Sequence, residues 1–492
     1  MELIKTNRKK FYYAIGYAIF VLPILFSIYY SVPASDDFIY GSFVSSDNVI
    51  INALTYIKYT YWQGSCRWLI FFLQKCINPL NLYSLWGVHL GHIYGIYAII
   101  VFAISMSLII YSIRYIVGLF VSKEAYRDFA TFLIIALLLS TFYYSEVYNW
   151  YTGATAYAIP FSFTLWLYVV ISRYFKDYTK RDYIMLFVVG ILPATNEFLC
   201  VPIGIVYLAY LIRDFKTVTA KKERIKHTIP LLFYIVMGGT VVFAPGTFVR
   251  REVNGGASVP AWRLLLQALI NIIVRIKDVV IDHPFAVILL VALFFIGVLT
   301  RGEKLHDIKV FMLIFGIGIY GAILPYCLGR GFTSTYMDVR MYYILDYYLL
   351  ISMALTALML GQNLAIRKDI SIDSLGRVRW GVIFAMFSYL MLVPQNDYLN
   401  ITQIDIVKKS SLIKESYAYW DGILTEIENS DEDDVVLYRD KSPDWTKYFL
   451  YVGIEPDNVY DQSFDAITPT DEIMVNVYYK KKSITLYYTE DN

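Results

Sequence analysis

The sequence predicts a polytopic α-helical membrane protein with a small α/β domain at its C-terminal end. Hydrophobic residues make up 58% of the 492 residues and charged residues only 17%, whereas soluble proteins average roughly 45–50% and about 25%. The mean hydropathy is +0.50, and apolar runs of membrane-spanning length recur along the chain. This composition excludes an ordinary soluble enzyme, a disordered chain and a nucleic-acid-binding module.

The formal net charge of +2 conceals two regions with different environments. Residues 395–492 hold 20 acidic and 9 basic residues, a net charge of −11. Residues 1–394 hold 34 basic and 21 acidic residues, a net charge of +13. We therefore expect a transmembrane domain over 1–394 and a soluble extracytoplasmic domain over 395–492.

Basic residues at the N-terminus set the expected orientation. Four of them, within positions 5–10, precede an apolar run over 11–32. This run is too long for the core of a signal peptide, and no small-residue cleavage site follows it. Because Lys and Arg are enriched at the cytoplasmic ends of spans, the N-terminus is expected inside. The loop over 33–85 then lies outside.

Eight further crossings and one broken hairpin are expected, which places the C-terminal domain outside. The hairpin, over 183–212, is interrupted at 193–197 and has basic residues at both ends. Irregular backbone at membrane depth needs protein or a wet cavity around it, so the hairpin tip implies a cavity. The other crossings are expected at 88–113, 129–145, 153–172, 229–244, 284–299, 310–328, 342–362 and 380–394.

Two segments outside the predicted spans are expected to form a surface helix and a small α/β domain. The outer segment over 245–284 carries basic residues spaced around an apolar stretch, which is typical of a helix on the membrane surface. Strand-like runs over 435–437, 472–479 and 484–488 give the C-terminal domain its expected α/β character. The four cysteines lack metal-binding spacing, which leaves either free thiols or a disulfide between the first two.

Two adjacent carboxylates, Asp36 and Asp37, stand just beyond the first span. Neighbouring carboxylates repel each other and raise one pKa. A carboxylate at the membrane face can act as a general base toward a hydroxyl or bind a cation. A solvated loop start is the alternative reading, since Ser35 followed by Asp36 is also a good helix cap.

The outer segments also contain groups that could bind a phosphate or a sugar. Arg67 lies between apolar stretches, which suits phosphate or carboxylate capture, although interfacial anchoring uses the same residue type. A turn over 143–153 carries Glu146, Asn149 and Trp150. These are groups that a sugar site needs, and an aromatic belt at the membrane boundary would also supply them.

Charged residues at membrane depth and at outer helix ends complete the candidate site. Asn196 and Glu197 lie at the hairpin tip, where an ionisable group is functional by default, or pairs with an arginine to lock helices together. Several arginines at outer helix ends could bind one anionic head group together or anchor lipid phosphates separately. They are Arg250, Arg251, Arg330 and Arg340.

The order of these motifs resembles the GT-C superfamily, multi-pass glycosyltransferases that use polyprenyl-phosphate-linked sugars, and a bacterial branch within it. The resemblance covers about residues 10–345. It implies a GT-C-like bundle in a bacterial cytoplasmic membrane. The motifs that carry it are Asp36-Asp37, Gly64-x-x-Arg67, Trp150-x-x-Gly153, Asn196-Glu197 and Pro245-Gly246 with Arg250.

The resemblance also implies a mechanism. The essential acidic residue of the family maps onto Asp36 or Asp37 and would deprotonate an acceptor hydroxyl, with inversion at the anomeric carbon. The arginines would bind the leaving polyprenyl phosphate, and the acceptor would be an extracytoplasmic glycan, lipid or polymer. Asp36-Asp37 lacks the Asp-x-Asp spacing of metal-dependent members, which favours a reaction without a metal or another cofactor.

Three other classes of protein fit parts of the pattern. A transporter of lipid-linked sugars would also have a broken hairpin and charges at the membrane midplane, but the sequence shows no internal repeat. A polysaccharide polymerase or ligase also uses outer arginines, and typically has a larger outer loop between late helices. A non-catalytic membrane assembly protein is the third class.

Overall fold

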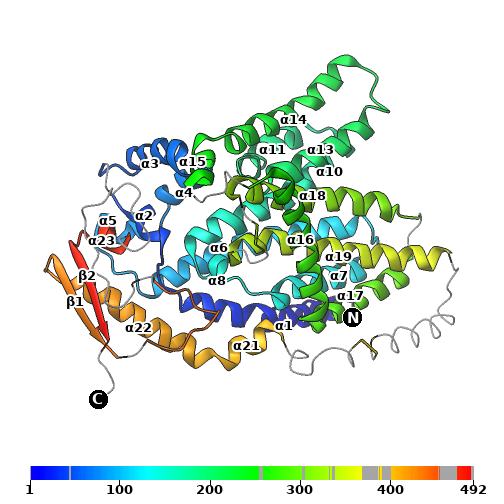
Figure 1. Cartoon of the computed structure of the whole chain (residues 1–492). Coiled ribbons are helices and arrows are strands. Elements are labelled where there is room, and N and C mark those ends of the chain that lie inside the picture. Colours follow the sequence, from blue (N-terminus) through cyan, green and yellow to red (C-terminus); the bar gives the residue numbers. More distant parts are fainter. Residues whose placement is uncertain are drawn as a thin grey trace.

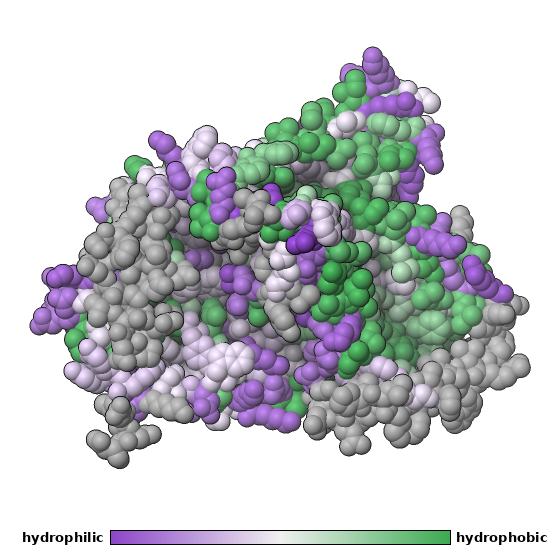
Figure 2. All heavy atoms as spheres, in the orientation of Figure 1, coloured by the Kyte–Doolittle hydropathy of each residue, from purple (hydrophilic) through white to green (hydrophobic). Residues whose placement is uncertain are grey.

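The computed structural model describes residues 2–43, 46–253, 259–301, 305–331, 333–334, 338–367, 386, 388–389, 400–440, 442–452, 454 and 474–488. Within these ranges the chain is a bundle of helices with one two-stranded sheet at one end (Figure 1). Apolar side chains cover the surface over α14 and α16–α18, and polar side chains gather near β1, α21 and α22 (Figure 2). The chain is therefore a multi-pass membrane protein with a polar end.

Among the described residues, six helical stretches are long and apolar enough to cross a membrane, and a bent pair of helices, α16 and α17, makes up to seven. Two stretches join neighbouring elements, α9 (Tyr151–Gly153) with η1 (Ala154–Ala158) and α10 (Ile159–Asp177), and α14 (Lys221–Val242) with α15 (Pro245–Val253). The other four are α1 (Glu2–Tyr29), α6 (His92–Gly118), α18 (Ile308–Arg330) and α19 (Val339–Arg367).

The expected count of nine crossings is not confirmed. A helix does form near 129–145, namely α7 (Glu124–Thr141), but it has only 18 residues and three of its first five are charged. Another forms near 284–299, namely α17 (Pro284–Thr300), with 17 residues. The ninth expected crossing, 380–394, lies almost entirely outside the described residues.

The segment predicted as a broken hairpin forms three helical pieces. They are α11 (Lys180–Val188), α12 (Ile191–Ala194) and α13 (Cys200–Asp214). The break over 195–199 contains Asn196 and Glu197, which are inside the protein. Non-helical backbone is thus buried within the bundle, as the membrane requires.

The segment expected outside the membrane over 33–85, here termed the first outer segment, folds into four short helices rather than an open loop. They are α2 (Asp36–Gly41), α3 (Val49–Gln63), α4 (Trp68–Cys76) and α5 (Asn81–Trp86). Lys75 of α4 fastens the C-terminal end of α2, because its Nζ donates to the carbonyl oxygens of Ile39 at 2.9 Å and Ser42 at 3.2 Å. Burial lowers the pKa of Lys75 to about 7.

The helix expected on the membrane surface is α16 (Ala261–Ile281), which meets α17 at 87°. Figure 1 shows it running across the direction of α17 and α19. Its Arg275 reaches inward and holds the buried Asp346 of α19 through two bonds, Nε–Oδ1 at 2.8 Å and Nη2–Oδ2 at 2.5 Å. A bidentate pair of this kind fixes both position and orientation, so α16 is tied to the bundle.

The C-terminal segment contains α21 (Thr402–Lys408), α22 (Ser410–Asn429), β1 (Asp434–Arg439), α23 (Met474–Tyr479) and β2 (Ser483–Tyr488). The strands pair in parallel, with Asp434 opposite Ser483 and Arg439 opposite Tyr488. The strand expected over 472–479 is wrong for residues 474–479, which form α23. A helical turn puts residues 474 and 478 on one face, and Tyr478 there packs against Phe38 of α2 at 5.5 Å between ring centroids.

The crossing of α17 and α19 depends on two facing glycines. A Cβ on Gly297 would lie 2.1 Å from the carbonyl oxygen of Leu358, and a Cβ on Gly361 would lie 2.0 Å from that of Phe294. Small residues let helix backbones approach closely where lipid provides no hydrophobic drive for association. By contrast, a Cβ on Gly316 of α18 would meet nothing within 4 Å.

We expect Gly297→Ala to destabilise the bundle, because the added methyl must push two backbones apart. Overpacking of this kind costs about 1–3 kcal/mol, which should lower the melting temperature of the detergent-purified protein by several degrees in a tryptophan-fluorescence scan. Gly316→Ala is the matched control and should leave the melting temperature unchanged or slightly raised. Equal effects of the two substitutions would contradict the close crossing.

Candidate functional site

A cavity of about 1060 Å³ lies where the first outer segment, the hairpin break, α15, α18 and the start of α19 meet. Its wall combines charged and aromatic side chains with an apolar part. The structure brings seven of the twelve predicted site residues to this wall, although they are distributed over more than 300 positions of the chain. They are Asp36, Arg67, Trp150, Glu197, Arg250, Arg251 and Arg340.

Asp37 does not line the cavity, because its carboxylate is fully buried and hydrogen-bonded on both oxygens. Oδ1 accepts from the Thr152 backbone N at 3.0 Å and from Thr152 Oγ1 at 2.6 Å. Oδ2 accepts from Tyr94 Oη at 2.5 Å and from Ala34 N at 3.3 Å. Burial raises the pKa of Asp37, these hydrogen bonds offset part of the rise, and the net result is a pKa of about 6. The carboxylate thus ties the start of α2 to α6 and to the turn that begins α9.

Asp36 precedes Asp37 on α2 and lines the cavity. Successive helical residues are rotated by about 100°, so burying Asp37 turns Asp36 to another side. The chain enters α2 through Ser35, whose φ of 45° is unusual for a residue with a side chain. Burial and then the charge of Asp36 raise the pKa of the cavity-lining Tyr56, whereas Arg250 lowers it. The charges of Asp36 and Arg250 therefore both influence the ionisation of the Tyr56 hydroxyl.

Arg67 and Glu197 form an ion pair across the cavity wall. Arg67 Nη2 lies 2.6 Å from Glu197 Oε1, its Nε donates to the same oxygen at 2.7 Å, and its Nη1 donates to Tyr157 Oη at 2.9 Å. Burial opposes the charge of Arg67, but Glu197 and Tyr157 outweigh burial and hold its pKa well above the usual value. The pair joins the first outer segment to the hairpin break.

Asn196 is buried beside this pair and supports it without lining the cavity. Its Nδ2 donates to the carbonyl oxygen of Ala156 at 3.2 Å, and its Oδ1 accepts from Phe198 N at 3.0 Å. The side chain thus satisfies one backbone N–H of the break between α12 and α13 and ties the break to the helical turn Ala154–Ala158. Asn196 fixes the position from which Glu197 faces the cavity.

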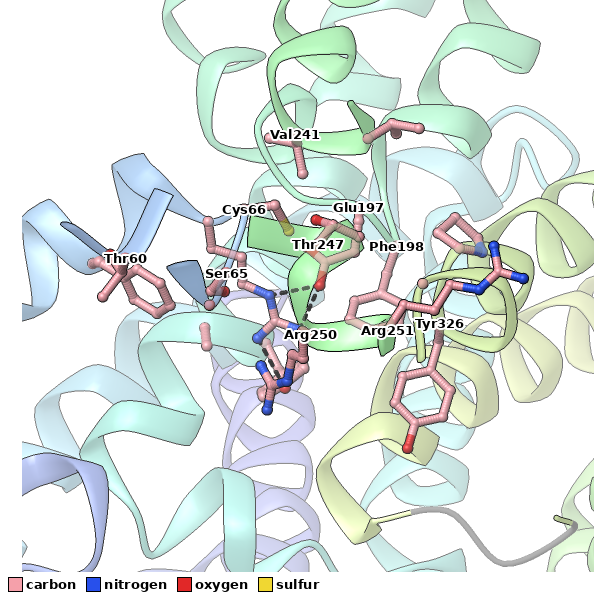
Figure 3. Close-up of a pocket in the computed structure, with 18 of the residues that line it drawn as sticks. Thr60, Ser65, Cys66, Glu197, Phe198, Val241, Thr247, Arg250, Arg251 and Tyr326 are labelled. Atoms are coloured by element: carbon pink, nitrogen blue, oxygen red, sulfur yellow. Dashed lines mark hydrogen bonds and ion pairs between the residues drawn. The ribbon is translucent and has the colours of Figure 1, made fainter. Parts of the chain in front are cut away.

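Arg250 and Arg251 reach the cavity from α15, and a close backbone contact places this helix. A Cβ on Gly246 would lie 2.7 Å from Ser65 N and 2.8 Å from Thr60 O, so only glycine lets α15 rest on the chain just before Arg67. The two guanidinium groups point to different sides of α15 in Figure 3. The Pro-Gly motif therefore brings Arg250 and Arg251 next to the Arg67–Glu197 pair.

Arg340, at the start of α19, closes another side of the cavity. Its Nη1 donates to Glu146 Oε2 at 2.7 Å, and its guanidinium carbon lies 5.7 Å from the centre of the Trp150 ring. Trp150 lines the cavity, and its Nε1 donates to the carbonyl oxygen of Ala34 at 2.9 Å. Glu146 thus positions the Arg340 guanidinium without lining the cavity itself. Trp150 connects this wall to the residues before α2.

The remaining predicted residues do not reach the cavity or cannot be placed there. Asn149 is fully buried and donates to the backbone carbonyl oxygen of Ser27 at 2.9 Å. Arg330 ends α18, and its side chain lies outside the described part of the structure. Among the described residues, no group of three or more His, Cys, Asp or Glu side chains could hold a metal ion.

All four cysteines are free, including Cys66, which lines the cavity. Burial, followed by the charge of Glu197, raises the pKa of the Cys66 thiol to about 12. A thiol needs to ionise in order to attack a substrate. Cys66 is therefore a poor nucleophile, and Asp36 is the better candidate for chemistry at this wall.

The far wall of the cavity is apolar and open to the surface of the bundle. Phe243 is 74% exposed and Phe248 is 50% exposed. Both residues lie within the candidate membrane span Lys221–Val253, so this side of the cavity presents apolar surface at a candidate span. The other apolar residues of this wall are Val201, Val241, Val242, Val253, Leu324 and Leu328.

Sequence reasoning missed the tyrosines of the cavity, above all Tyr157. It lies in a π-helical turn, Ala154–Ala158, which interrupts the stretch of α9 and α10. Such turns are frequent at functional sites, and this one aims the Tyr157 hydroxyl at Arg67. No spacing in the sequence marks it, because the segment has the composition of an ordinary apolar helix.

Taken together, the cavity offers a carboxylate, several guanidinium groups and an apolar opening. A carboxylate can accept a proton from a hydroxyl, and guanidinium groups bind phosphate oxygens in pairs. No protein-family model, no curated protein and no solved structure matches the chain. A function for the chain is therefore inferred from the geometry of the cavity.

We expect Asp37→Asn to lower the stability of the protein, because an amide group replaces one of two acceptor oxygens and faces a donor. An unsatisfied buried group costs about 1–3 kcal/mol. Asp36→Asn is the matched control and should lower the melting temperature less, since Asp36 lies at the cavity wall and outside the buried network of Asp37. Thermal unfolding of both variants in the same detergent checks this, and a stable Asp37→Asn variant would argue against the buried network.

Proposed function

We propose that the protein is an integral membrane glycosyltransferase of the GT-C type. It transfers a sugar from a polyprenyl-phosphate-linked donor to an extracytoplasmic glycan, lipid or polymer. The single observation that carries the proposal is the cavity itself, in which Asp36 and several arginines share one space with an apolar opening at candidate membrane spans. Such a donor has a lipid chain, a phosphate and a sugar, and the cavity has a wall for each.

The arginines support the phosphate part of the proposal. Arg67, Arg250, Arg251 and Arg340 line the same cavity but come from three separate segments of the chain. Two of them have carboxylate partners, Glu197 and Glu146, so the cavity also holds acidic groups that position guanidinium groups. A phosphate arriving between them would be bound from several sides by charge-assisted hydrogen bonds.

The reaction assigned to Asp36 is a direct displacement. The acceptor hydroxyl oxygen attacks the anomeric carbon of the donor sugar, and its proton passes to the Asp36 carboxylate. The bond between the anomeric carbon and the phosphate oxygen breaks, and the electron pair stays on the phosphate, where the arginines offset the negative charge. One displacement inverts the anomeric centre. Asp37 stays buried and positions α2.

The lipid part of the donor would lie along the apolar wall between α13, α14 and α18. Val201, Val242 and Leu324 come from these helices and line the cavity. A prenyl chain leaving through this opening would stay in the hydrocarbon part of the membrane, where it has no hydration to lose. The sugar and phosphate would remain at the charged wall. A donor with an apolar chain and a charged head would account for the presence of an apolar wall and a charged wall in one cavity.

Release of free polyprenyl phosphate from a panel of polyprenyl-phosphate sugars tests the proposal. We expect the purified protein to consume at least one donor when an acceptor glycan or lipid extract is present. Asp36→Asn should reduce the rate about 10²- to 10⁴-fold, as expected for removal of a general base. The rate should be followed with and without EDTA, since the sequence favours a reaction that needs no metal.

A matched control separates loss of the base from loss of charge. Asp47 lies in the same outer segment, is exposed and does not line the cavity, so Asp47→Asn should keep full activity. If no donor is consumed but donors bind equally well to the wild type and to Asp36→Asn, the glycosyltransferase function is ruled out. A transporter of lipid-linked sugars, which the broken hairpin also fits, would then be the better explanation.

A further inference from the structure

A second cavity, of about 640 Å³, lies at the opposite end of the bundle. It is formed by the C-terminal ends of α6, α10 and α13 and by the start of α7. Arg114 lines it, 22 residues after His92 at the start of α6, which corresponds to about 33 Å along the helix. This is close to the roughly 30 Å of a bilayer's hydrocarbon core. Since Tyr94 near the start of α6 holds Asp37 next to the first cavity, the two cavities lie at opposite ends of this helix.

The second cavity is lined by four cationic side chains and by no carboxylate among the described residues. Two of the cations, Arg114 and Arg127, have acidic partners just beyond it. Arg114 Nε lies 2.8 Å from Asp128 Oδ1, and Arg114 Nη2 lies 3.1 Å from Glu124 Oε1. The Nε of Arg127 is buried without a hydrogen-bond partner. An anion is the ligand that such a wall can hold.

The other two cations, Lys176 and Arg213, have no carboxylate within ion-pair distance in the described part of the chain. Both are exposed at the ends of their helices. Arg213 lies over the ring of Tyr210, with 5.6 Å between its guanidinium carbon and the ring centre. Like charges gathered in one cavity repel each other, and a bound anion removes this repulsion.

The aromatic residues of the cavity place it at the edge of the membrane. Tyr111 lies one turn before Arg114 on α6, and Tyr210 lies one turn before Arg213 on α13, so each ring shares a face with its arginine. Tyrosine rings followed by basic residues are typical of the membrane–water boundary. Tyr111 lines the cavity and is 47% exposed. A ligand here has apolar surface on one side and cations on the other.

We propose that this second cavity binds the phosphate-bearing head group of an anionic lipid from the leaflet at the N-terminal side of the bundle. The phosphate lies between Lys176, Arg213 and Arg127, and the acyl chains lie along Tyr111. The site is separate from the cavity at Asp36, and it stands whether or not the protein is a glycosyltransferase. Its effect is to hold the ends of α6, α10 and α13 together.

Native mass spectrometry of the detergent-purified protein with phosphatidylglycerol, and with phosphatidylcholine for comparison, tests this site. We expect the wild type to retain phosphatidylglycerol, and the double variant Lys176→Gln/Arg213→Gln to bind it at least about tenfold more weakly, since each basic residue near a lipid head group contributes to binding. Thermal unfolding without added lipid shows that the double variant is folded. Inorganic phosphate and pyrophosphate, titrated in the same detergent, show whether a soluble phosphate occupies the cavity instead.

The matched control is Lys221→Gln/Lys222→Gln, which removes the same charge from exposed positions at the start of α14 that do not line the cavity. Loss of phosphatidylglycerol binding in the cavity variant alone supports the proposal. Binding of pyrophosphate that depends on the same two residues supports the phosphate site and reassigns its source to a soluble compound. Equal losses in both double variants, or no preference for phosphatidylglycerol over phosphatidylcholine, overturn the proposal.

Discussion

The buried carboxylate of Asp37 is the constraint on which the candidate site depends. It accepts hydrogen bonds from Ala34, Tyr94 and Thr152, and so fastens the start of α2 to two distant segments. A buried charge is costly unless it is hydrogen-bonded, so this arrangement fixes α2 in one orientation. Asp36 can then face the cavity from a rigid support rather than from a mobile loop.

The cavity is built by the same logic on its other sides. Gly246 lets α15 rest on the chain before Arg67, Glu197 holds Arg67 from the hairpin break, and Glu146 holds Arg340. Each arginine therefore has a defined position before any ligand arrives. Preorganised charges stabilise a developing anion without reorganisation during the reaction, which is the property that a polyprenyl phosphate leaving group requires.

The sequence predicted the kinds of residue at the site better than their roles. Charges at outer helix ends and at the hairpin tip were identifiable because they are costly in or near a membrane, and six of them meet in one cavity. Which of Asp36 and Asp37 faces it depends on the backbone of Ser35 and on donors at positions 94 and 152, contacts that no local pattern encodes. The π-helical turn that aims Tyr157 at Arg67 was equally hidden, and α23 follows its packing against α2 rather than its strand-like sequence.

The most direct test of the account is the position of polyprenyl phosphate in the protein, determined by cryo-electron microscopy in a lipid nanodisc. We expect the phosphate within hydrogen-bond distance of at least two of Arg67, Arg250, Arg251 and Arg340, with the prenyl chain along α13 and α18 and with Asp36 on the open side of the phosphate. A phosphate bound away from these arginines, or an Asp36 turned out of the cavity, would contradict the proposed function.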